Sequence, residues 1–129
     1  MCGIAGIITS KSSPEELFPL LKVLTDAIAH RGPDGFGFHA APSIGLALAR
    51  LSIIDLSTGD QPIHNPRRTV WTVFNGEIFN FVELRQMLEA KGHQFYTQSD
   101  TEVIVHLYDR YGEDFVQHLN GGVIWALRK

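Results

Sequence analysis

Residues 44–49 read IGLALA, an almost unbroken apolar run in the first half of the chain. A strand with so little alternation between apolar and polar residues is typical of a position where both faces of a sheet are covered. Residues 3–9 (GIAGIIT) predict another buried strand, and residues 36–40 and 70–74 predict two more. We therefore expect neighbouring layers on both sides of the sheet that contains residues 44–49.

Helices are predicted between and after these strands. A Ser-Pro pair with glutamate three residues after the serine begins a helix at Ser13, which should end near His30. Two further helices are expected, one capped by Asn80 and one opening at residues 99–102. The remaining predictions are a short strand at 95–97, a helical turn at 113–119 and a last strand at 122–127. This intermixing favours a layered α+β domain over a regular βαβ chain.

Composition limits the class of protein. The 129 residues are enough for one domain with a core. Eleven basic and fourteen acidic side chains argue against a nucleic-acid partner, and no apolar stretch is long enough to span a membrane. The single cysteine excludes an intramolecular disulfide framework, which fits a reducing compartment, so we expect the cytoplasm. The histidines show no metal-ligand spacing, so we expect no metal site.

The only cysteine is Cys2. If the initiator methionine is removed, Cys2 becomes the N-terminal residue and carries both a thiol and a free α-amine. An α-amine has a typical pKa of about 7.7–8.0, so a fraction is neutral near pH 7 and can act as a base for the thiol. The alternative is that Cys2 is a small buried apolar residue or an inert thiol.

Other polar residues also have two interpretations. Arg50, at the end of the apolar run, is either a surface residue with a buried stem or an anion ligand. Asn75-Gly76 is the strongest two-residue turn signal, so residues 75–77 are a hairpin turn or part of a site. Asp100 opens a helix and is by itself a routine cap. Arg31 and Asp34 lie in a Gly-Pro loop, where a structural role is as plausible as a substrate contact.

Six motifs occur in a characteristic order. They are Cys2-Gly3-Ile4-Ala5-Gly6-Ile7, His30-Arg31-Gly32-Pro33-Asp34, Arg50-Leu51-Ser52-Ile53-Ile54-Asp55, Gly59-Asp60-Gln61-Pro62, Phe74-Asn75-Gly76-Glu77-Ile78-Phe79-Asn80 and Ser99-Asp100-Thr101-Glu102. The series resembles the N-terminal glutaminase domain of glutamine-dependent asparagine synthetases, a class II glutamine amidotransferase among the N-terminal-nucleophile hydrolases. The resemblance implies a layered α/β/β/α fold, incomplete at the C-terminus of this chain. It fades over residues 122–129.

The resemblance also implies roles for individual residues. Cys2 would attack the side-chain amide of glutamine and form a thioester. The Asn75 side chain and the Gly76 backbone N–H would stabilise the resulting oxyanion. Arg50 would hold the substrate carboxylate, with Leu51 and Ile53 from the same motif beside it. Glu77 and Asp100 would face the substrate ammonium group.

For the chain as a whole, the resemblance implies a truncated glutaminase domain over residues 1–129, without the synthetase domain. No cofactor is expected here, because ATP and magnesium would belong to the synthetase domain or subunit that receives the ammonia. An open sheet edge and an apolar face would favour self-association.

Three functions remain open at this stage. The first is a glutamine amidohydrolase, the second an inactive fragment that binds glutamine or a partner, and the third an N-terminal-nucleophile amidase for another amide. The charges of Arg50 and Asp100 favour an amino-acid substrate over the third function.

Overall fold

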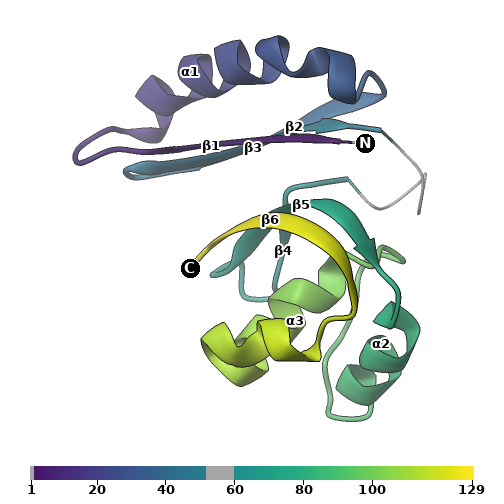
Figure 1. The fold of residues 1–129 in the computed structure, drawn as a ribbon. Coiled ribbons are helices and arrows are strands. Elements are labelled where there is room, and N and C mark those ends of the chain that lie inside the picture. The colour runs from purple at the N-terminus through teal and green to yellow at the C-terminus, as the bar shows by residue number, and fades with distance from the viewer. Residues whose placement is uncertain (1, 52–59) are drawn as a thin grey trace.

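Two antiparallel three-stranded sheets lie face to face, and helices cover their outer faces (Figure 1). This computed structural model describes residues 2–51 and 60–129. The strands are β1 (Gly3–Ile8), β2 (Gly35–Ala41), β3 (Ile44–Arg50), β4 (Ile63–His64), β5 (Trp71–Ile78) and β6 (Gly121–Arg128). The helices are α1 (Pro14–Ala27), α2 (Phe81–Glu89) and α3 (Glu102–Tyr111), with 3₁₀ turns η1 (Ala29–Arg31) and η2 (Gly112–His118).

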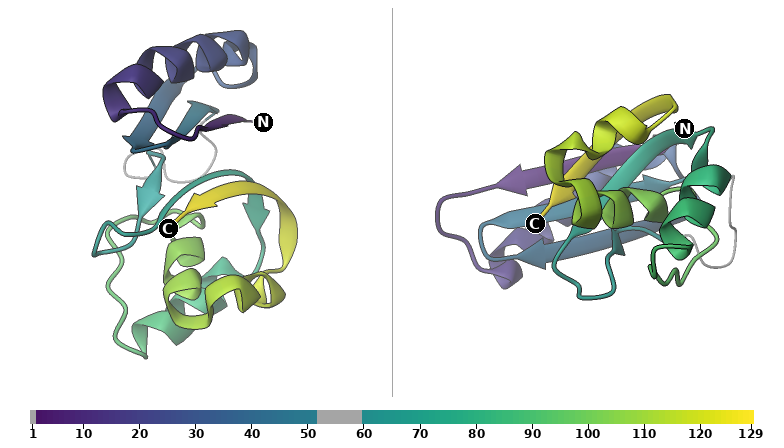
Figure 2. Two further views of the ribbon diagram at one scale, coloured as in Figure 1. Left: turned by 90° about the vertical axis from the view of Figure 1, so that its left-hand side faces the viewer. Right: turned by 90° about the horizontal axis from the view of Figure 1, so that it is seen from below.

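The first sheet has the order β1-β3-β2, with the apolar strand β3 at its centre. Gly3 pairs with Ala49, and Gly35 pairs with Arg50. This register brings the N-terminal end of the chain beside the end of β3. The second sheet has the order β4-β5-β6, with β5 at its centre. Figure 2 shows the two sheets and their helices from two further sides.

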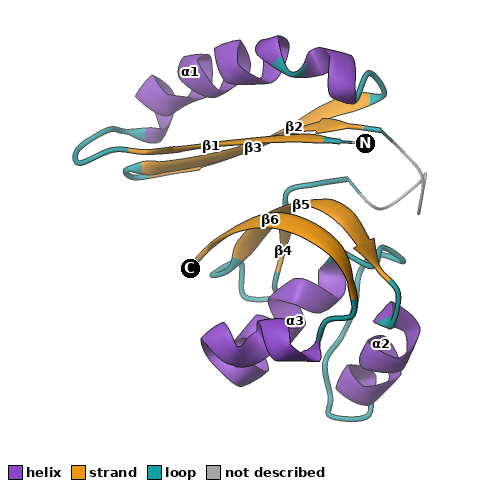
Figure 3. Ribbon diagram, viewed as in Figure 1, coloured by secondary structure: helices purple, strands orange, loops and turns teal. Residues whose placement is uncertain are grey.

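Helix α1 packs on the outer face of the first sheet (Figure 3). Its start is the predicted capping box, because the Ser13 side chain accepts the Glu16 N–H and the Glu16 carboxylate accepts the Ser13 N–H. Leu17 and Leu21 are fully buried. A Cβ on Gly45 of β3 would lie 2.7 Å from a methyl carbon of Leu21, so glycine at this position leaves room for the buried Leu21 side chain.

Alternate residues of the central strands face different layers. Leu46 and Leu48 of β3 meet Val73 of β5 in the space between the sheets. The next residue of β5, Phe74, packs in a larger core with Leu107 of α3 and other buried residues of the helical layer. Strand β3 is thus covered on both faces, as its apolar run predicted, and the layered α/β/β/α arrangement is confirmed.

The structure decides between two interpretations and departs from the predictions in three further places. Of the two interpretations of residues 75–77, the hairpin turn is excluded, because β5 continues to Ile78 and pairs with β6 along its whole length. Residues 95–97 are not a strand. Strand β4 was not predicted, since two residues carry no periodic pattern. Asn80 occupies the cap position of α2 without capping it: its side chain instead bonds the backbone of His118 and Asn120.

Among the described residues, no helix is both long and apolar enough to cross a membrane.

Candidate active site

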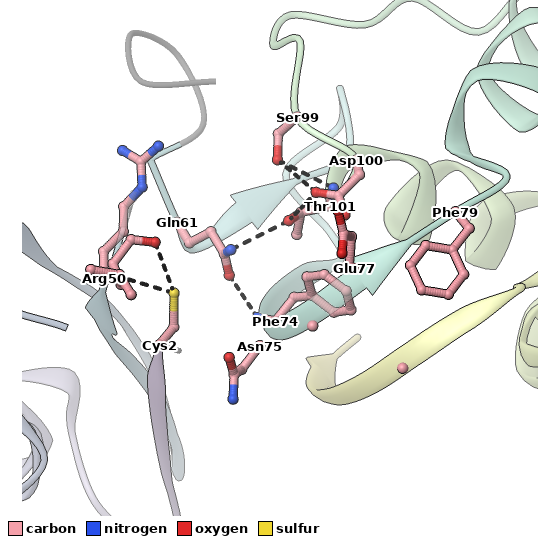
Figure 4. A pocket seen from close by; sticks show the side chains of 13 residues that line it. Cys2, Arg50, Gln61, Phe74, Asn75, Glu77, Phe79, Ser99, Asp100 and Thr101 are labelled. Carbon is pink, nitrogen blue, oxygen red and sulfur yellow. Dashed lines mark hydrogen bonds between the residues drawn. The ribbon is translucent and has the colours of Figure 1, made fainter. Parts of the chain in front are cut away.

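A cleft of about 320 Å³ opens where the two sheets meet the start of α3 (Figure 4). Segments far apart in the sequence line it: the residue before β1, the end of β3, the middle of β5 and the loop before α3. The lining residues are Cys2, Arg50, Leu51, Gln61, Phe74, Asn75, Gly76, Glu77, Phe79, Ser99, Asp100, Thr101 and Gly122. Seven of the eight predicted site residues are therefore in one cleft. The eighth, Ile53, lies outside the described residues.

Cys2 is half-buried and is held beside the end of β3. The Leu51 N–H donates to its Sγ over 3.3 Å, and the Sγ lies 3.4 Å from the Leu51 carbonyl oxygen. On the other side, the Arg31 side chain donates to the Cys2 carbonyl oxygen over 3.2 Å. Arg31 thus fixes the backbone of Cys2. The thiol itself faces the cleft, because Cys2 is among its lining residues.

Asn75 and Gly76 lie in the part of β5 that borders the cleft. Pairing of Asn75 with Ile124 and of Gly76 with Val123 holds this stretch extended. A regular strand fixes the direction of its amides and side chains better than a free turn does. The donors that the family resemblance implies for an oxyanion are therefore on a regular strand that lines the same cleft as the thiol.

Arg50 supplies a positive charge at the end of β3. Its side chain is 11% exposed, and its guanidinium forms an ion pair with Asp60, whose side chain is 86% exposed. Ion pairs with such an exposed partner contribute about 0–1 kcal/mol, so another carboxylate can replace this one at small cost. The contact shows that the guanidinium accommodates a carboxylate. Asp34 lies nearby, in a second hollow that shares Arg50 and Asp60.

Asp100 supplies a buried negative charge. Its Oδ2 accepts the Ile78 N–H over 3.1 Å, and its Oδ1 lies 3.4 Å from the Ser99 hydroxyl. Burial raises the pKa of Asp100 above its ordinary value, and the hydrogen bonds from the backbone and from Ser99 and Thr101 offset part of that rise. Glu77, also on the cleft, is exposed. The two carboxylates make this part of the cleft suited to a cation.

Gln61 lines the cleft too, although it was not among the predicted site residues. Its Oε1 accepts the Phe74 N–H over 2.6 Å, and its Nε2 donates to the Thr101 hydroxyl over 3.3 Å. It therefore joins β5, beside Asn75, to the segment that carries Asp100. Its place in the Gly59-Asp60-Gln61-Pro62 motif was the only available signal.

Within the part of the chain that the structure describes, no cluster of three or more His, Cys, Asp or Glu side chains is arranged to hold a metal ion.

The cleft thus combines a thiol, a guanidinium and two carboxylates. A thiol suits nucleophilic attack on a carbonyl carbon. A guanidinium suits a carboxylate group, and buried or clustered carboxylates suit an ammonium group. The arrangement fits a small amino acid whose side chain ends in a reactive carbonyl group.

Comparisons with known proteins identify the family of the chain. Residues 1–128 match the family described as "Glutamine amidotransferase domain". Asparagine synthetase [glutamine-hydrolyzing] 1 of Bacillus subtilis (strain 168) is 42% identical over 126 residues, which are 94% of this chain and 20% of the relative. Asparagine synthetase [glutamine-hydrolyzing] 3 of Arabidopsis thaliana is 42% identical over 127 residues, which are 98% of this chain and 22% of the relative. The chain spans about a fifth of the length of these relatives.

A solved structure has the same fold. Glutamine phosphoribosylpyrophosphate amidotransferase from B. subtilis matches with a TM-score of 0.71 at 22% identity, over 99% of this chain and 35% of that one. This likeness confirms the layered α+β fold. Together with the family match over almost every residue, it leads to one conclusion. The chain belongs to the glutamine amidotransferase domain family.

Proposed function

We propose that this chain is a glutamine amidohydrolase domain, which releases ammonia from L-glutamine for amide transfer, as in asparagine synthesis. The observation that supports this most is the cleft, where Cys2, Arg50 and Asp100 come together from three distant parts of the sequence. The printed names of the asparagine synthetase relatives, which are glutamine-hydrolysing, agree with this substrate.

The charges of the cleft suggest how glutamine is oriented. Arg50 takes the α-carboxylate in place of Asp60, and Asp100 with Glu77 takes the α-ammonium group. Leu51 packs beside the aliphatic part of the substrate. The side-chain amide then points to Cys2, with Asn75 and Gly76 near its oxygen.

The proposed reaction has two covalent steps. After removal of Met1, the α-amine of Cys2 accepts the thiol proton, directly or through a water, and the Sγ forms a bond to the amide carbon. The negative charge on the amide oxygen is stabilised by the Asn75 side-chain N–H and the Gly76 N–H. The C–N bond breaks, and the proton passes from the amine to the leaving nitrogen, which departs as ammonia. Water then adds to the thioester carbon, the C–S bond breaks, and glutamate and the free thiol are released.

The wider assignment follows from the same relatives. We propose that residues 1–129 are part of a glutaminase domain and that a synthetase domain or subunit receives the ammonia. No cofactor takes part in the glutaminase reaction as written, so ATP and magnesium would serve the synthetase.

The proposal is tested by measuring the release of ammonia and glutamate from L-glutamine. Intact mass confirms beforehand that the protein has lost Met1. We expect release by the wild-type chain and none above background by Cys2→Ala. Equal release by Cys2→Ala would overturn the proposal. Glutamine binding without release by the wild-type chain would favour the second function, an inactive glutamine-binding domain.

A further inference from the structure

Glu102, the first residue of α3, carries a fully buried carboxylate that lies outside the cleft. Its Oε1 accepts the Tyr96 N–H over 2.9 Å. Its Oε2 accepts both the N–H and the hydroxyl of Thr97, over 2.7 and 2.6 Å. His106, one turn along α3, lies 3.3 Å from Oε1 through its Nε2. Burying a carboxylate costs free energy unless it is fully hydrogen-bonded. A carboxylate that is buried with such a complete set of partners therefore needs an explanation.

The bonds of Glu102 continue toward the cleft. The Thr97 hydroxyl donates to Glu102 and accepts the Ser99 N–H over 3.1 Å. The Ser99 hydroxyl in turn accepts the Thr101 N–H over 3.2 Å and lies 3.4 Å from Asp100 Oδ1. Hydrogen bonds therefore link Glu102 to Thr97 and Thr97 to the backbone of Ser99, and the Ser99 side chain makes the contact with Asp100.

Electrostatics support a charged Glu102. Burial alone would raise the pKa of Glu102, but the hydrogen bonds from His106, Thr97 and Tyr96 outweigh it and lower the pKa below its ordinary value. Because a carboxylate only accepts hydrogen bonds, it fixes the donors of Tyr96 and Thr97 in one arrangement. A protonated acid or an amide in its place would present a hydrogen to those donors.

We propose that Glu102 is a positioning residue for substrate: it holds residues 96–101 so that Asp100 faces the α-ammonium group of glutamine. The inference rests on the proposed function, because it concerns the ligand of that same cleft. It explains why this acid reaches back to the loop before α3 instead of lying on the surface of the helix. Glu102 touches neither the substrate nor Cys2, so its effect should appear in binding and not in the chemical step.

The test compares two ligands in binding experiments on the Cys2→Ala protein. L-glutamine carries the α-ammonium group, and glutaramate has the same amide and carboxylate without it. We expect Glu102→Gln to weaken glutamine binding about tenfold or more, since hydrogen bonds to charged groups are involved. Glutaramate binding should change less than about threefold. Asp100→Asn should give the same pattern.

Two further variants separate positioning from loss of folding. Thr97→Val removes the hydroxyl between Glu102 and Ser99 but leaves the backbone bond to Glu102, and should weaken glutamine binding selectively. Thr97→Ser keeps the hydroxyl and should bind glutamine like the parent protein. Glu83→Gln, at an exposed position on α2, is the matched control and should bind like the parent protein. Thermal unfolding of each variant shows whether it is folded.

In active protein, the same variants should raise the KM for glutamine and leave kcat within about threefold. Glutamine binding that is unchanged by Glu102→Gln and Thr97→Val would overturn the inference and leave the proposed function intact. Equal weakening of both ligands by folded variants would also overturn it, because the effect would not act through Asp100. If the parent protein binds no glutamine, both the proposed function and this inference are wrong.

Discussion

Asp100 is 5% exposed. Its negative charge would let it bind an ammonium group, but burying that charge costs free energy. Burial raises its pKa, as described above. An acid whose pKa is raised in the folded state stabilises the fold fully below its unfolded pKa. That stabilisation is lost as the pH rises through the folded pKa. At neutral pH the ionised Asp100 therefore lowers the free energy of unfolding, as expected for a residue kept for binding.

We predict that Asp100→Asn stabilises the chain at pH 7 by about 0.5–1 kcal/mol, because it removes a buried charge and keeps an oxygen for the Ile78 N–H. The gain should shrink as the pH falls through the raised pKa of Asp100, and it should be gone below the ordinary range of an aspartate. Urea unfolding at several pH values measures this, with the exposed Asp26→Asn as control. A variant less stable than the wild-type chain at pH 7 would contradict the prediction.

The role proposed for Arg50 can be tested by a single substitution. Lysine keeps the charge but loses the planar, two-pronged geometry that suits a carboxylate. We predict that Arg50→Lys raises the KM for glutamine about tenfold or more and changes kcat little. Steady-state ammonia release measures both constants. Arg67→Lys, at an exposed arginine that forms an ion pair with Asp109, should match the wild-type enzyme. An unchanged KM in Arg50→Lys would exclude Arg50 as the carboxylate ligand.

At the scale of elements, β5 decides the geometry of the cleft. Its Asn-Gly pair has a strong local preference for a turn, yet the strand continues because β6 pairs with it as far as Ile78 and Gly121. Long-range pairing overrides the local preference here. Asn75, Gly76 and Glu77 thereby gain fixed directions along one edge of the cleft.

The contact between these strands depends on Gly121. A Cβ at this position would lie 2.0 Å from the Glu77 carbonyl oxygen, whereas a Cβ on Gly122 would meet nothing within 4 Å. We predict that Gly121→Ala lowers the free energy of unfolding by about 1–3 kcal/mol, because backbone must move to relieve the overlap. Chemical denaturation measures the change. Gly122→Ala is the matched control for stability, and an equal loss in both variants would contradict the argument.

The elements that the sequence predicted well are those with a strong apolar pattern. Strand β3 and the capping box of α1 are both confirmed. The errors lie where a distant partner decides the local structure. Residues 95–97 have a strand-like composition, but the backbone N–H groups of Tyr96 and Thr97 bond the Glu102 carboxylate, so no strand forms. Nothing in that tripeptide reveals such a partner.

At the scale of the whole molecule, the cleft depends on how the two sheets are aligned. Arg50 ends a strand of the first sheet, Cys2 directly precedes another strand of that sheet, and Asn75 comes from the second sheet. The contacts between the sheets centre on Leu46, Leu48 and Val73. A loss of packing there weakens both the fold and the alignment of the thiol with the donors on β5.

We therefore predict that Leu48→Ala lowers the free energy of unfolding by about 2–5 kcal/mol, through lost burial and the cavity that remains. Ammonia release should fall even at temperatures where the variant is folded. Urea unfolding and the activity assay together measure this. Ile8→Ala, at a position 84% exposed on the same sheet, should change stability by less than about 0.5 kcal/mol. Full activity in folded Leu48→Ala would show that the alignment does not depend on this contact.

The residues that line the cleft were easier to predict than the contacts that hold them in place. The order of six motifs pointed to Cys2, Arg50 and Asp100, and the structure places all three in one cleft. The supporting contacts of Gln61 and Glu102 were not foreseen, because they join segments that are distant or irregular in the sequence. Periodicity shows which face of an element is buried, but not which elements meet.

Cys2 is expected to form a covalent bond with the substrate during turnover, and intact mass after acid quenching tests this most directly. Wild-type protein that has lost Met1, mixed with L-glutamine and quenched during turnover, should carry one γ-glutamyl group on Cys2 that hydroxylamine removes. Cys2→Ala should carry none. Ammonia release by protein whose Cys2 stays unmodified at every quench time, with equal release by Cys2→Ala, would contradict the account.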